Sequence, residues 1–436
     1  VGSVDQNGVL SPAETSSLEA RFHLVRENGQ WRIDAPADGV VVSQASFTAS
    51  HELVSLMFLS ATGDSLIADP RWYPTRRVET HMLEGLIAGP QSHLSDALVN
   101  AIPSGTSISA GGIELSDHVA KVSLNGTLPS DDRGKQLMAW EISQTLQRSG
   151  RVNSVEINVG GEALPSSGLP SQPSFDLDSA VALNSNGLVR IDGRSVSTRI
   201  LPITPSTSAS LPAVSPVSSS LLAWREDDRL VLVDSSTNAT RVVDGSEGHY
   251  SPSIDRFGWV WDIPRGGNLR ASRIDGQNLA IASENQSLNG VSAVRVSPDG
   301  ARALLLRQVG GSTSAWIAGI ERRGSGEPIA LTDPEPLAGL STGVDDVSWA
   351  GRSTVVAVRQ GGLRAGNDQV DEVSLVTVPV GGFPSVLALP TGTQRLSAGS
   401  SSATMVIRGK DGNYQVRSGA LWQSLEGNLR DVNFPG

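Results

Sequence analysis

The feature of this sequence that most limits its fold is a repeated strand–turn–strand pattern, clearest at residues 294–307. There Val294 and Val296 alternate with polar residues, Pro298-Asp299-Gly300 is a turn signal, and residues 303–306 form a second apolar run. Related stretches, each followed by an apolar run, lie at residues 213–219, 250–258, 345–351 and 395–399. Repeats every 36 to 51 residues are typical of four-stranded propeller blades, so the sequence predicts an all-β propeller over residues 177–436.

The two ends of this repeat region complement each other. Residues 431–436 resemble residues 346–351 and predict a first strand with no blade after it. Three further strands, expected at residues 180–184, 188–192 and 198–203, have no first strand before them. We therefore expect the C-terminal strand to complete the first blade of six and close the ring, which removes exposed edges. Residues 204–220, rich in proline and serine, are then expected to connect two blades.

An α+β unit is predicted at residues 51–160, in the order β-α-β-β-α-β with its helices on one face of a sheet. Residues 69–74 are predicted to be a loop, because they carry two prolines. One helix carries apolar residues from Val78 to Ile87 and stops at Gly89-Pro90. A second helix, expected to be capped by Ser130, leads to a final strand at residues 152–159.

Residues 1–50 resemble the end of a further domain. Asn28-Gly29 is a strong hairpin signal between two apolar runs, and residues 40–47 predict another strand. Such a β fragment packs poorly by itself, so we interpret it as the remnant of an upstream N-terminal domain. The chain begins at Val1 without Met, and we expect any membrane anchor to lie upstream. Residues 161–176 contain several prolines and serines and predict a short linker.

Composition limits the partners of this chain. The net charge is −11 and no basic stripe is present, which argues against nucleic acid as a partner. Cysteine is absent, so disulfides and thiolate metal sites are excluded. No apolar run reaches transmembrane length. These properties predict a soluble, β-rich protein and leave the cellular compartment open.

The sequence offers no catalytic, cofactor or metal constellation. None of the histidines is spaced as a metal-binding pair, no Gly-x-Ser-x-Gly elbow appears, and Gly134-Lys135 lacks the rest of a phosphate loop. We therefore predict that the chain is not an enzyme and has no cofactor. The histidines are His23, His51, His81, His93, His118 and His249.

Two groups of residues nevertheless deserve a functional interpretation. Acidic residues gather at Asp345-Asp346 and at Asp368, Asp371 and Glu372, where a propeller could place glycosidase carboxylates or a calcium ligand set, although a solvated loop is the simpler interpretation. The segment Arg71-Trp72-Tyr73 combines basic and aromatic side chains in a predicted loop and is a candidate partner-binding surface. Trp72 is equally well explained as a cover for a sheet edge.

Several motifs give a family resemblance. Residues 56–59, Pro70-Arg-Trp72, residues 86–90 and Ile102-Pro-Ser-Gly-Thr106 resemble the GerMN domain of spore-germination and actinobacterial envelope proteins. A GerMN-like domain joined by a short linker to a C-terminal propeller resembles the actinobacterial LpqB lipoprotein family. That resemblance implies a lipid anchor at the outer face of the cytoplasmic membrane.

The same resemblance implies a function. Members of the family are accessory proteins of a two-component system, contact the extracytoplasmic part of an MtrB-like sensor kinase and contribute to cell-envelope homeostasis. The expected function is therefore non-enzymatic and depends on protein–protein contacts. The alternative is a cell-wall glycan-binding or glycan-cleaving protein that uses the propeller channel. This alternative requires paired carboxylates or aromatic side chains that face the channel.

Overall fold

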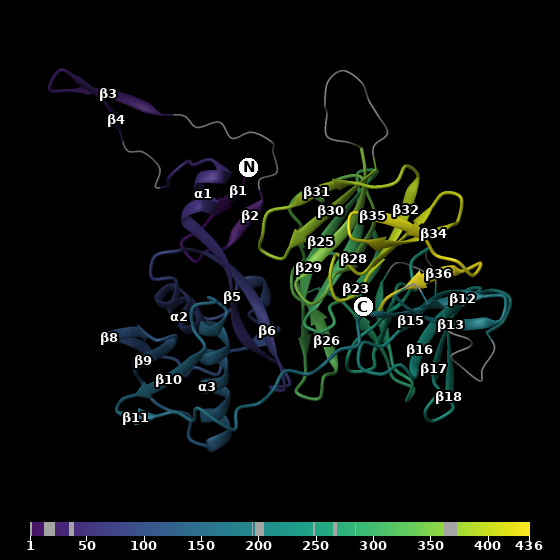
Figure 1. Ribbon diagram of the computed structural model, residues 1–436, viewed down its shortest axis with the longest axis horizontal. Coiled ribbons are helices and arrows are strands. Elements are labelled where there is room, and N and C mark those ends of the chain that lie inside the picture. Colours follow the sequence, from purple (N-terminus) through teal and green to yellow (C-terminus); the bar gives the residue numbers. More distant parts are fainter. Residues whose placement is uncertain are drawn as a thin grey trace.

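The computed structural model describes residues 2–12, 22–34, 39–193, 195–196, 205–246, 249–264, 268–283, 285–361 and 373–436. It contains an N-terminal segment, an α+β domain and a larger all-β domain that lies beside it (Figure 1). Within the described residues, no helix has the length and apolar character needed to cross a bilayer.

The N-terminal segment contains two hairpins and a short helix: β1 (Gly2–Val4), β2 (Leu10–Pro12), β3 (His23–Glu27), β4 (Gln30–Asp34) and α1 (Gln44–Ser50). The hairpin predicted at Asn28-Gly29 is confirmed, since both residues have the positive φ that a tight turn between β3 and β4 requires. The strand predicted at residues 40–47 is wrong. Ser43 accepts a hydrogen bond from Ser46 N at 3.1 Å and thereby caps α1.

The α+β domain has two sheets, of order β6-β5-β7 and β11-β10-β9-β8, where one was predicted. Helices α2 and α3 contact strands of both sheets, so they do not lie on one face of a single sheet as expected. The elements are β5 (His51–Ser60), β6 (Leu66–Pro74), α2 (Val78–Ala88), η1 (Ser92–Leu94), β7 (Leu98–Val99), β8 (Ser107–Ser116), β9 (Val119–Asn125), α3 (Asp132–Gln147), β10 (Ser154–Val159) and β11 (Glu162–Ala163).

Two local predictions for this domain are corrected by the structure. The expected loop at residues 69–74 belongs to strand β6, because Pro70 and Pro74 are tolerated in a strand that pairs only with β5. The cap of α3 is Asp131, whose carboxylate accepts a hydrogen bond from Gly134 N at 2.7 Å, and not Ser130. The end of α2 at Gly89 is as predicted.

The all-β domain contains six antiparallel sheets in the described part of residues 179–433. The first sheet joins β12 (Ser179–Asn184), β13 (Gly187–Asp192) and β14 (Ser195–Val196) to β36 (Arg430–Asn433). The second has β15 (Ala209–Val214), β16 (Leu221–Glu226), β17 (Arg229–Asp234) and β18 (Ala239–Asp244). The third has β19 (Ser253–Ile254), β20 (Val260–Asp262), β21 (Leu269–Ser272) and β22 (Asn278–Ile281).

The remaining three sheets follow in chain order. The fourth has β23 (Val291–Val296), β24 (Arg302–Val309), β25 (Ser312–Arg322), β26 (Pro328–Leu331) and β27 (Glu335–Pro336). The fifth has β28 (Val344–Trp349), β29 (Thr354–Gln360), β30 (Val373–Pro379) and β31 (Ser385–Ala388). The sixth has β32 (Thr393–Ala398), β33 (Met405–Gly409), β34 (Tyr414–Ser418) and β35 (Leu421–Ser424).

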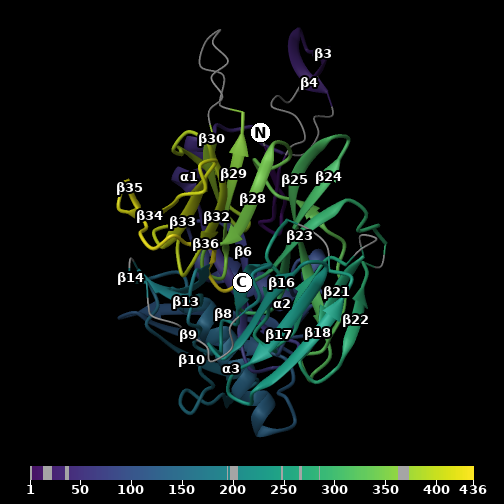
Figure 2. The same ribbon diagram turned by 90° about the vertical axis from the view of Figure 1, so that its right-hand side faces the viewer.

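Innermost strands of successive sheets contact one another, from β36 to β15, β19, β23, β28 and β32 and back to β36. Figure 2 shows the sheets around the region that holds β36. Serine side chains connect several neighbours. The Oγ atoms of Ser253, Ser348 and Ser397 accept hydrogen bonds at 2.8 to 3.1 Å from backbone N–H groups of the next innermost segment. The residues of the repeat thus join sheets to each other.

Other predictions for this domain have mixed outcomes. The turn at residues 298–300 is confirmed: Gly300 has φ of 75° and its N–H donates to the Ser297 carbonyl at 2.7 Å. The connection expected at residues 204–220 is wrong, because β15 lies within it. The strand expected at residues 198–203 falls outside the described residues. Four of the six repeat-region tryptophans are fully buried between strands: Trp224, Trp259, Trp261 and Trp349.

The two domains are packed together through both apolar and polar contacts. Ala301 of the all-β domain belongs to the apolar core of the α+β domain. The Arg256 guanidinium pairs with the Asp64 carboxylate, and Arg302 Nη2 donates to the Ala68 carbonyl. These contacts place one side of the β19–β22 and β23–β27 sheets against β5 and β6 and leave the innermost strands free to form a separate pocket.

Candidate functional site

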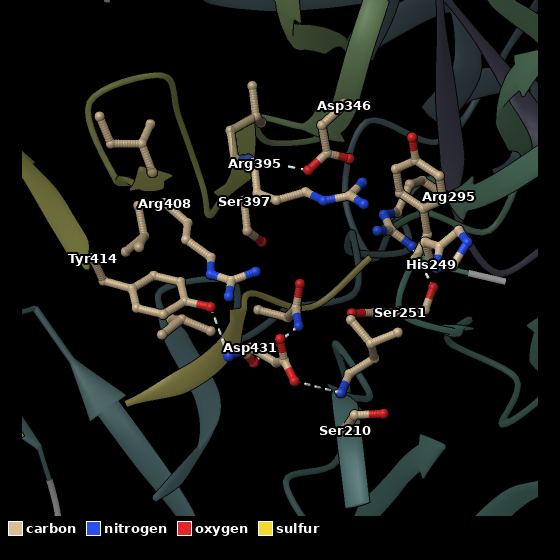
Figure 3. Close-up of a pocket in the computed structure, with 17 residues that line it drawn as sticks. Ser210, His249, Ser251, Arg295, Asp346, Arg395, Ser397, Arg408, Tyr414 and Asp431 are labelled. Carbon is tan, nitrogen blue, oxygen red and sulfur yellow. Dashed lines mark hydrogen bonds between the residues drawn. The ribbon is translucent and has the colours of Figure 1, made fainter. Parts of the chain in front are cut away.

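A pocket of about 380 Å³ lies among the innermost strands of the all-β domain (Figure 3). Residues of all six sheets or of the segments that lead into them line this pocket. Five of the sheets contribute through their innermost strands, with Ser210 from β15, Arg295 from β23, Asp346 from β28, Arg395 from β32 and Asp431 from β36. We call this pocket among the innermost strands the channel pocket, or the channel.

Positive charge dominates the lining. The guanidinium groups of Arg295, Arg395 and Arg408 point toward the space between them (Figure 3). Arg395 lies 4.1 Å above the ring of Tyr250, and Arg408 lies 6.0 Å from the ring of Tyr414. Arginine on an aromatic face is held in place by a cation–π attraction. These tyrosines therefore act as supports that orient two of the three cations.

The two carboxylates of the pocket are already engaged by the backbone. Asp346 accepts hydrogen bonds from Val347 N and Leu396 N, both at 3.0 Å. Asp431 accepts one from Leu211 N at 3.1 Å. Carboxylates held in this way join neighbouring strands, so neither has the free geometry of an acid–base pair.

Burial sets the charge state of these groups. Desolvation raises the pKa of Asp346, although Arg295 and Arg395 stabilise its charged form. Burial also acts against the charged form of Arg395, but the Asp346 carboxylate and Tyr250 outweigh this effect and raise the pKa of Arg395. The Asp346 carboxylate therefore favours the cationic form of Arg395.

Backbone strain concentrates at one wall of the pocket. Leu211 has φ of 53° and Asp431 has φ of 51°, values that side chains with a Cβ rarely adopt. The two residues are hydrogen-bonded to each other, and Tyr414 Oη accepts a hydrogen bond from Asp431 N at 2.6 Å. Strained residues that are held by several contacts are common where a fold forms a binding site.

The segment Arg71-Trp72-Tyr73, predicted as a partner-binding surface, lies in strand β6 and is buried. Arg71 forms a two-point ion pair with Asp69, with Nη2 to Oδ2 at 2.8 Å. Trp72 Nε1 donates to the Gly381 carbonyl of the all-β domain at 2.9 Å. Burial raises the pKa of Tyr73 to about 12. In the structure these side chains contact the chain's own domains.

The other residues singled out from the sequence lie apart. Asp345 accepts a hydrogen bond from the Gln360 side chain, Asp346 lines the channel, and Asp368, Asp371 and Glu372 fall outside the described residues. Among the histidines only His249 borders the pocket. Across the described ranges, no three His, Cys, Asp or Glu side chains are grouped so that they could hold a metal ion.

The sequence reasoning missed the arginines of the channel. Arg295 stands between Val294 and Val296, and simple alternation assigns such a residue to a solvent-facing side. In an innermost strand, the side chains that alternation assigns to solvent line the channel instead. The signal that could have identified these residues is an arginine within the apolar first strand of a repeat. Arg295 and Arg395 both have this position in their repeats.

One strongly perturbed acid lies outside the pocket. Glu141 of α3 is fully buried, and burial raises its pKa to about 8. Its Oε2 accepts a hydrogen bond from Ala101 N at 2.8 Å, whereas Oε1 has no partner among the described residues. It lines neither the pocket among the innermost strands nor the smaller pocket beside Phe257 and Arg322.

Known proteins resemble this chain in its sequence. It is 27 % identical to a lipoprotein LpqB of Streptomyces coelicolor over the whole chain and 78 % of that relative. It is 24 % identical to the lipoprotein LpqB of Rhodococcus jostii, over 82 % of this chain and 66 % of that relative. It is 30 % identical to the lipoprotein LpqB of Cutibacterium acnes, over 38 % of this chain and 28 % of that relative.

Solved structures and family models complete the comparison. TolB from Acinetobacter baumannii has a TM-score of 0.44 at 14 % identity, over 91 % of this chain and 86 % of that one. The tandem GerMN domains of GerM from Bacillus subtilis have a TM-score of 0.22 at 14 % identity, over 33 % of this chain and 59 % of that one. Residues 1–48 match an LpqB N-terminal domain and residues 55–165 a sporulation and spore germination domain. Residues 181–435, more than half of the chain, match the lipoprotein LpqB β-propeller domain, and the chain therefore belongs to the LpqB lipoprotein family.

Proposed function

We propose that this chain is a non-enzymatic, extracytoplasmic accessory lipoprotein that acts through contacts with the extracytoplasmic domain of an MtrB-like sensor kinase. The observation that carries the non-enzymatic part is the state of the channel carboxylates. Asp346 and Asp431 are held by backbone N–H groups, and arginines surround them. A glycosidase needs one free acid and one free carboxylate facing the substrate.

The union of the two domains supports a role as a binding platform. The Arg256–Asp64 ion pair, the Trp72–Gly381 hydrogen bond and the contact of Ala301 with the α+β core fix one domain against the other. A surface that spans both domains is then preorganised, which lowers the entropic cost of binding a large partner. The names of the relatives support lipid anchoring at the membrane that holds such a kinase.

The six sheets also support the six-bladed ring expected from the repeats. We propose that the first blade is shared, with β36 as its innermost strand, since β36 pairs with β12 and contacts both β15 and β32. Hydrogen exchange tests this arrangement. Removal of residues 429–436 is expected to accelerate exchange of the β12 amides, and unchanged protection of β12 would contradict the shared blade.

Binding to the kinase is tested with purified components. The whole chain is immobilised, and the extracytoplasmic domain of the MtrB-like kinase from the same organism is passed over it in an interferometry experiment. Saturable binding is expected, and the extracytoplasmic domain of an unrelated sensor kinase serves as the control. Equal signals for the two kinases, or none for either, would count against the proposal.

The glycan-related alternative retains one supporting observation. Tyr250 and Tyr414 line the channel, as a sugar-binding site requires, although both rings are in contact with arginines. Incubation of the whole chain with purified cell-wall glycan, followed by analysis of soluble fragments, separates cleavage from binding. Release of fragments that is lost in Asp346→Asn and Asp431→Asn would favour an enzyme and overturn the non-enzymatic proposal.

A further inference from the structure

The channel pocket concentrates positive charge within an acidic protein. The chain carries a net charge of −11, yet three arginines and only two carboxylates line this pocket. Attraction between charges is strengthened where a cavity excludes water, so an anion that enters the channel gains more than at the outer surface. The local charge is therefore opposite in sign to that of the whole chain.

Two of the arginines have hydrogen-bond donors without an acceptor. Arg395 Nη1 and Arg408 Nε are buried and find no partner within the described residues. A buried donor that stays unpaired destabilises the fold, because its hydration is lost and nothing replaces it. An anionic oxygen that reaches either group would supply the missing acceptor.

The supporting residues keep these donors in the channel. The Tyr250 and Tyr414 rings contact Arg395 and Arg408, and Tyr250 Oη is itself fixed by donation to the Asp345 carbonyl at 2.7 Å. Figure 3 shows Arg395 and Arg408 extending from one side of the pocket, with Ser210 and Asp431 on the opposite side. The cationic part of the pocket thus adjoins a part suited to hydroxyl groups.

We propose that the channel pocket binds a small organic anion, whose phosphate or carboxylate group is held by Arg395 and Arg408 and whose polar body contacts Ser210 and Asp431. A volume of about 380 Å³ lies at the lower end of the range for small-molecule sites, which fits a monosaccharide phosphate or a molecule of similar size. Arginine binds phosphate and carboxylate oxygens through two parallel donors, so both groups are compatible with the site. This inference is independent of the kinase proposal.

Calorimetry on the whole chain tests the inference at low ionic strength. The probes are glucose 6-phosphate, glucuronate, sn-glycerol 3-phosphate and inorganic phosphate, with glucose as the neutral control. At least one anion is expected to bind saturably and more weakly as chloride is added, while glucose does not bind. Preference for sn-glycerol 3-phosphate would indicate a lipid headgroup as the source, and preference for glucose 6-phosphate or glucuronate a soluble sugar derivative.

Matched variants locate the bound anion. Arg395→Gln and Arg408→Gln are each expected to raise Kd about tenfold or more, with a smaller increase for Arg408→Lys. Arg229→Gln removes the same charge from an exposed position of β17 and is expected to leave Kd within about twofold. The inference is overturned if no anion binds, if glucose binds equally well, or if Arg408→Gln binds like the original chain. Arg408→Gln alone decides the question if Arg395→Gln does not fold.

Discussion

Two buried clusters of arginine and aspartate in the all-β domain differ in how fully they are paired. In the first, Asp255 accepts four hydrogen bonds: from Phe257 N and Trp259 N, from Trp261 Nε1, and from Arg322 Nη2 at 2.8 Å. The remaining Arg322 nitrogens donate to the carbonyls of Gly300 and Gly326. In the channel cluster, among the described residues, Asp346 accepts hydrogen bonds from backbone N–H groups and Arg395 Nη1 finds no acceptor.

This difference separates two uses of the same chemistry. A cluster in which every donor and acceptor is paired has nothing left to offer a ligand, so its contribution is to the stability of the sheets it connects. A cluster that lines a cavity and keeps free donors can bind an anion at the expense of some stability. The following substitutions test this distinction, in order of decreasing expected effect.

Substitution of the saturated cluster has the largest expected effect. Asp255→Ala leaves Arg322 buried without its anionic partner and removes acceptors from three further donors, so the free energy of unfolding should fall by about 3 to 5 kcal/mol. Urea denaturation measures this loss, with the exposed Asp244→Ala as the control. A decrease below about 1 kcal/mol would contradict the structural role of this cluster.

A buried acid without any cation provides the second test. The pKa of Glu141 is raised to about 8, so the folded chain keeps a proton that the unfolded chain releases above its ordinary value of 4.5. Stability is therefore expected to fall as the pH rises from 4.5 to 8, at up to about 1.4 kcal/mol per pH unit. Glu141→Gln removes this dependence and should stabilise the chain by about 2 kcal/mol at pH 7, after allowance for one weakened hydrogen bond.

Urea denaturation between pH 4 and pH 9 checks the expected dependence for Glu141. The original chain and Glu141→Gln should differ least at pH 4 and most at pH 9. Glu84→Gln, on the exposed side of α2, is the matched control and should follow the original chain. Parallel pH profiles for the original chain and Glu141→Gln would show that the carboxyl is not perturbed.

The contact between domains provides a third test. Trp72→Phe keeps most of the apolar volume but deprives the Gly381 carbonyl of its donor, which is expected to cost about 1 to 2 kcal/mol. In scanning calorimetry the midpoint should fall, and the two domains should separate into distinct transitions. Trp31→Phe alters an exposed tryptophan of the N-terminal hairpin and should leave the trace unchanged.

Substitution of the channel aspartate, Asp346, should cost little stability and should strengthen anion binding, in contrast to substitution of Asp255. Asp346→Asn keeps one oxygen acceptor and removes a carboxylate that competes for Arg395, so the loss of stability should stay near 1 kcal/mol. Affinity for the anion that binds the original chain should rise about threefold to tenfold in the same calorimetric experiment. Weaker binding would show that the carboxylate itself contacts the ligand.

The smallest effect is expected at an exposed ion pair. Lys135 Nζ lies 2.6 Å from Glu162 Oε1 on the surface of the α+β domain. Water and salt screen such a pair, so Lys135→Ala should leave the unfolding midpoint unchanged within error. A clear decrease would mean that the short strand β11, which carries Glu162, depends on this contact.

The sequence was sufficient for what depends on local patterns. Alternating apolar residues and the turn at Gly300 predicted β23 and β24, and Asn28-Gly29 predicted the exposed hairpin of β3 and β4. Predictions failed where a distant neighbour decides the outcome. Pro70 predicts a loop from its local sequence, yet it lies in β6, an edge strand of its sheet, where proline is tolerated.

The candidate site was harder to predict for the same reason. Arg395 and Arg408 are partners in the pairing of β32 with β33, but only the arrangement of the sheets brings Arg295 to the same cavity. Asp346 was identified as an acidic residue of interest, but its two arginine neighbours could not be inferred from its own segment. A pocket lined by residues of several sheets leaves no compact motif in the sequence.

The pairing of β12 with β36 has a consequence for the biogenesis of the chain. Leu183 pairs with Arg430, so an apolar strand at the start of the domain waits for a partner that is synthesised more than 200 residues later. Until the residues of β36 emerge from the ribosome or from a translocation channel, β12 presents an open edge to other chains, and closure of so long a loop is entropically costly. The time between these two events is the period in which the nascent chain most needs protection from aggregation.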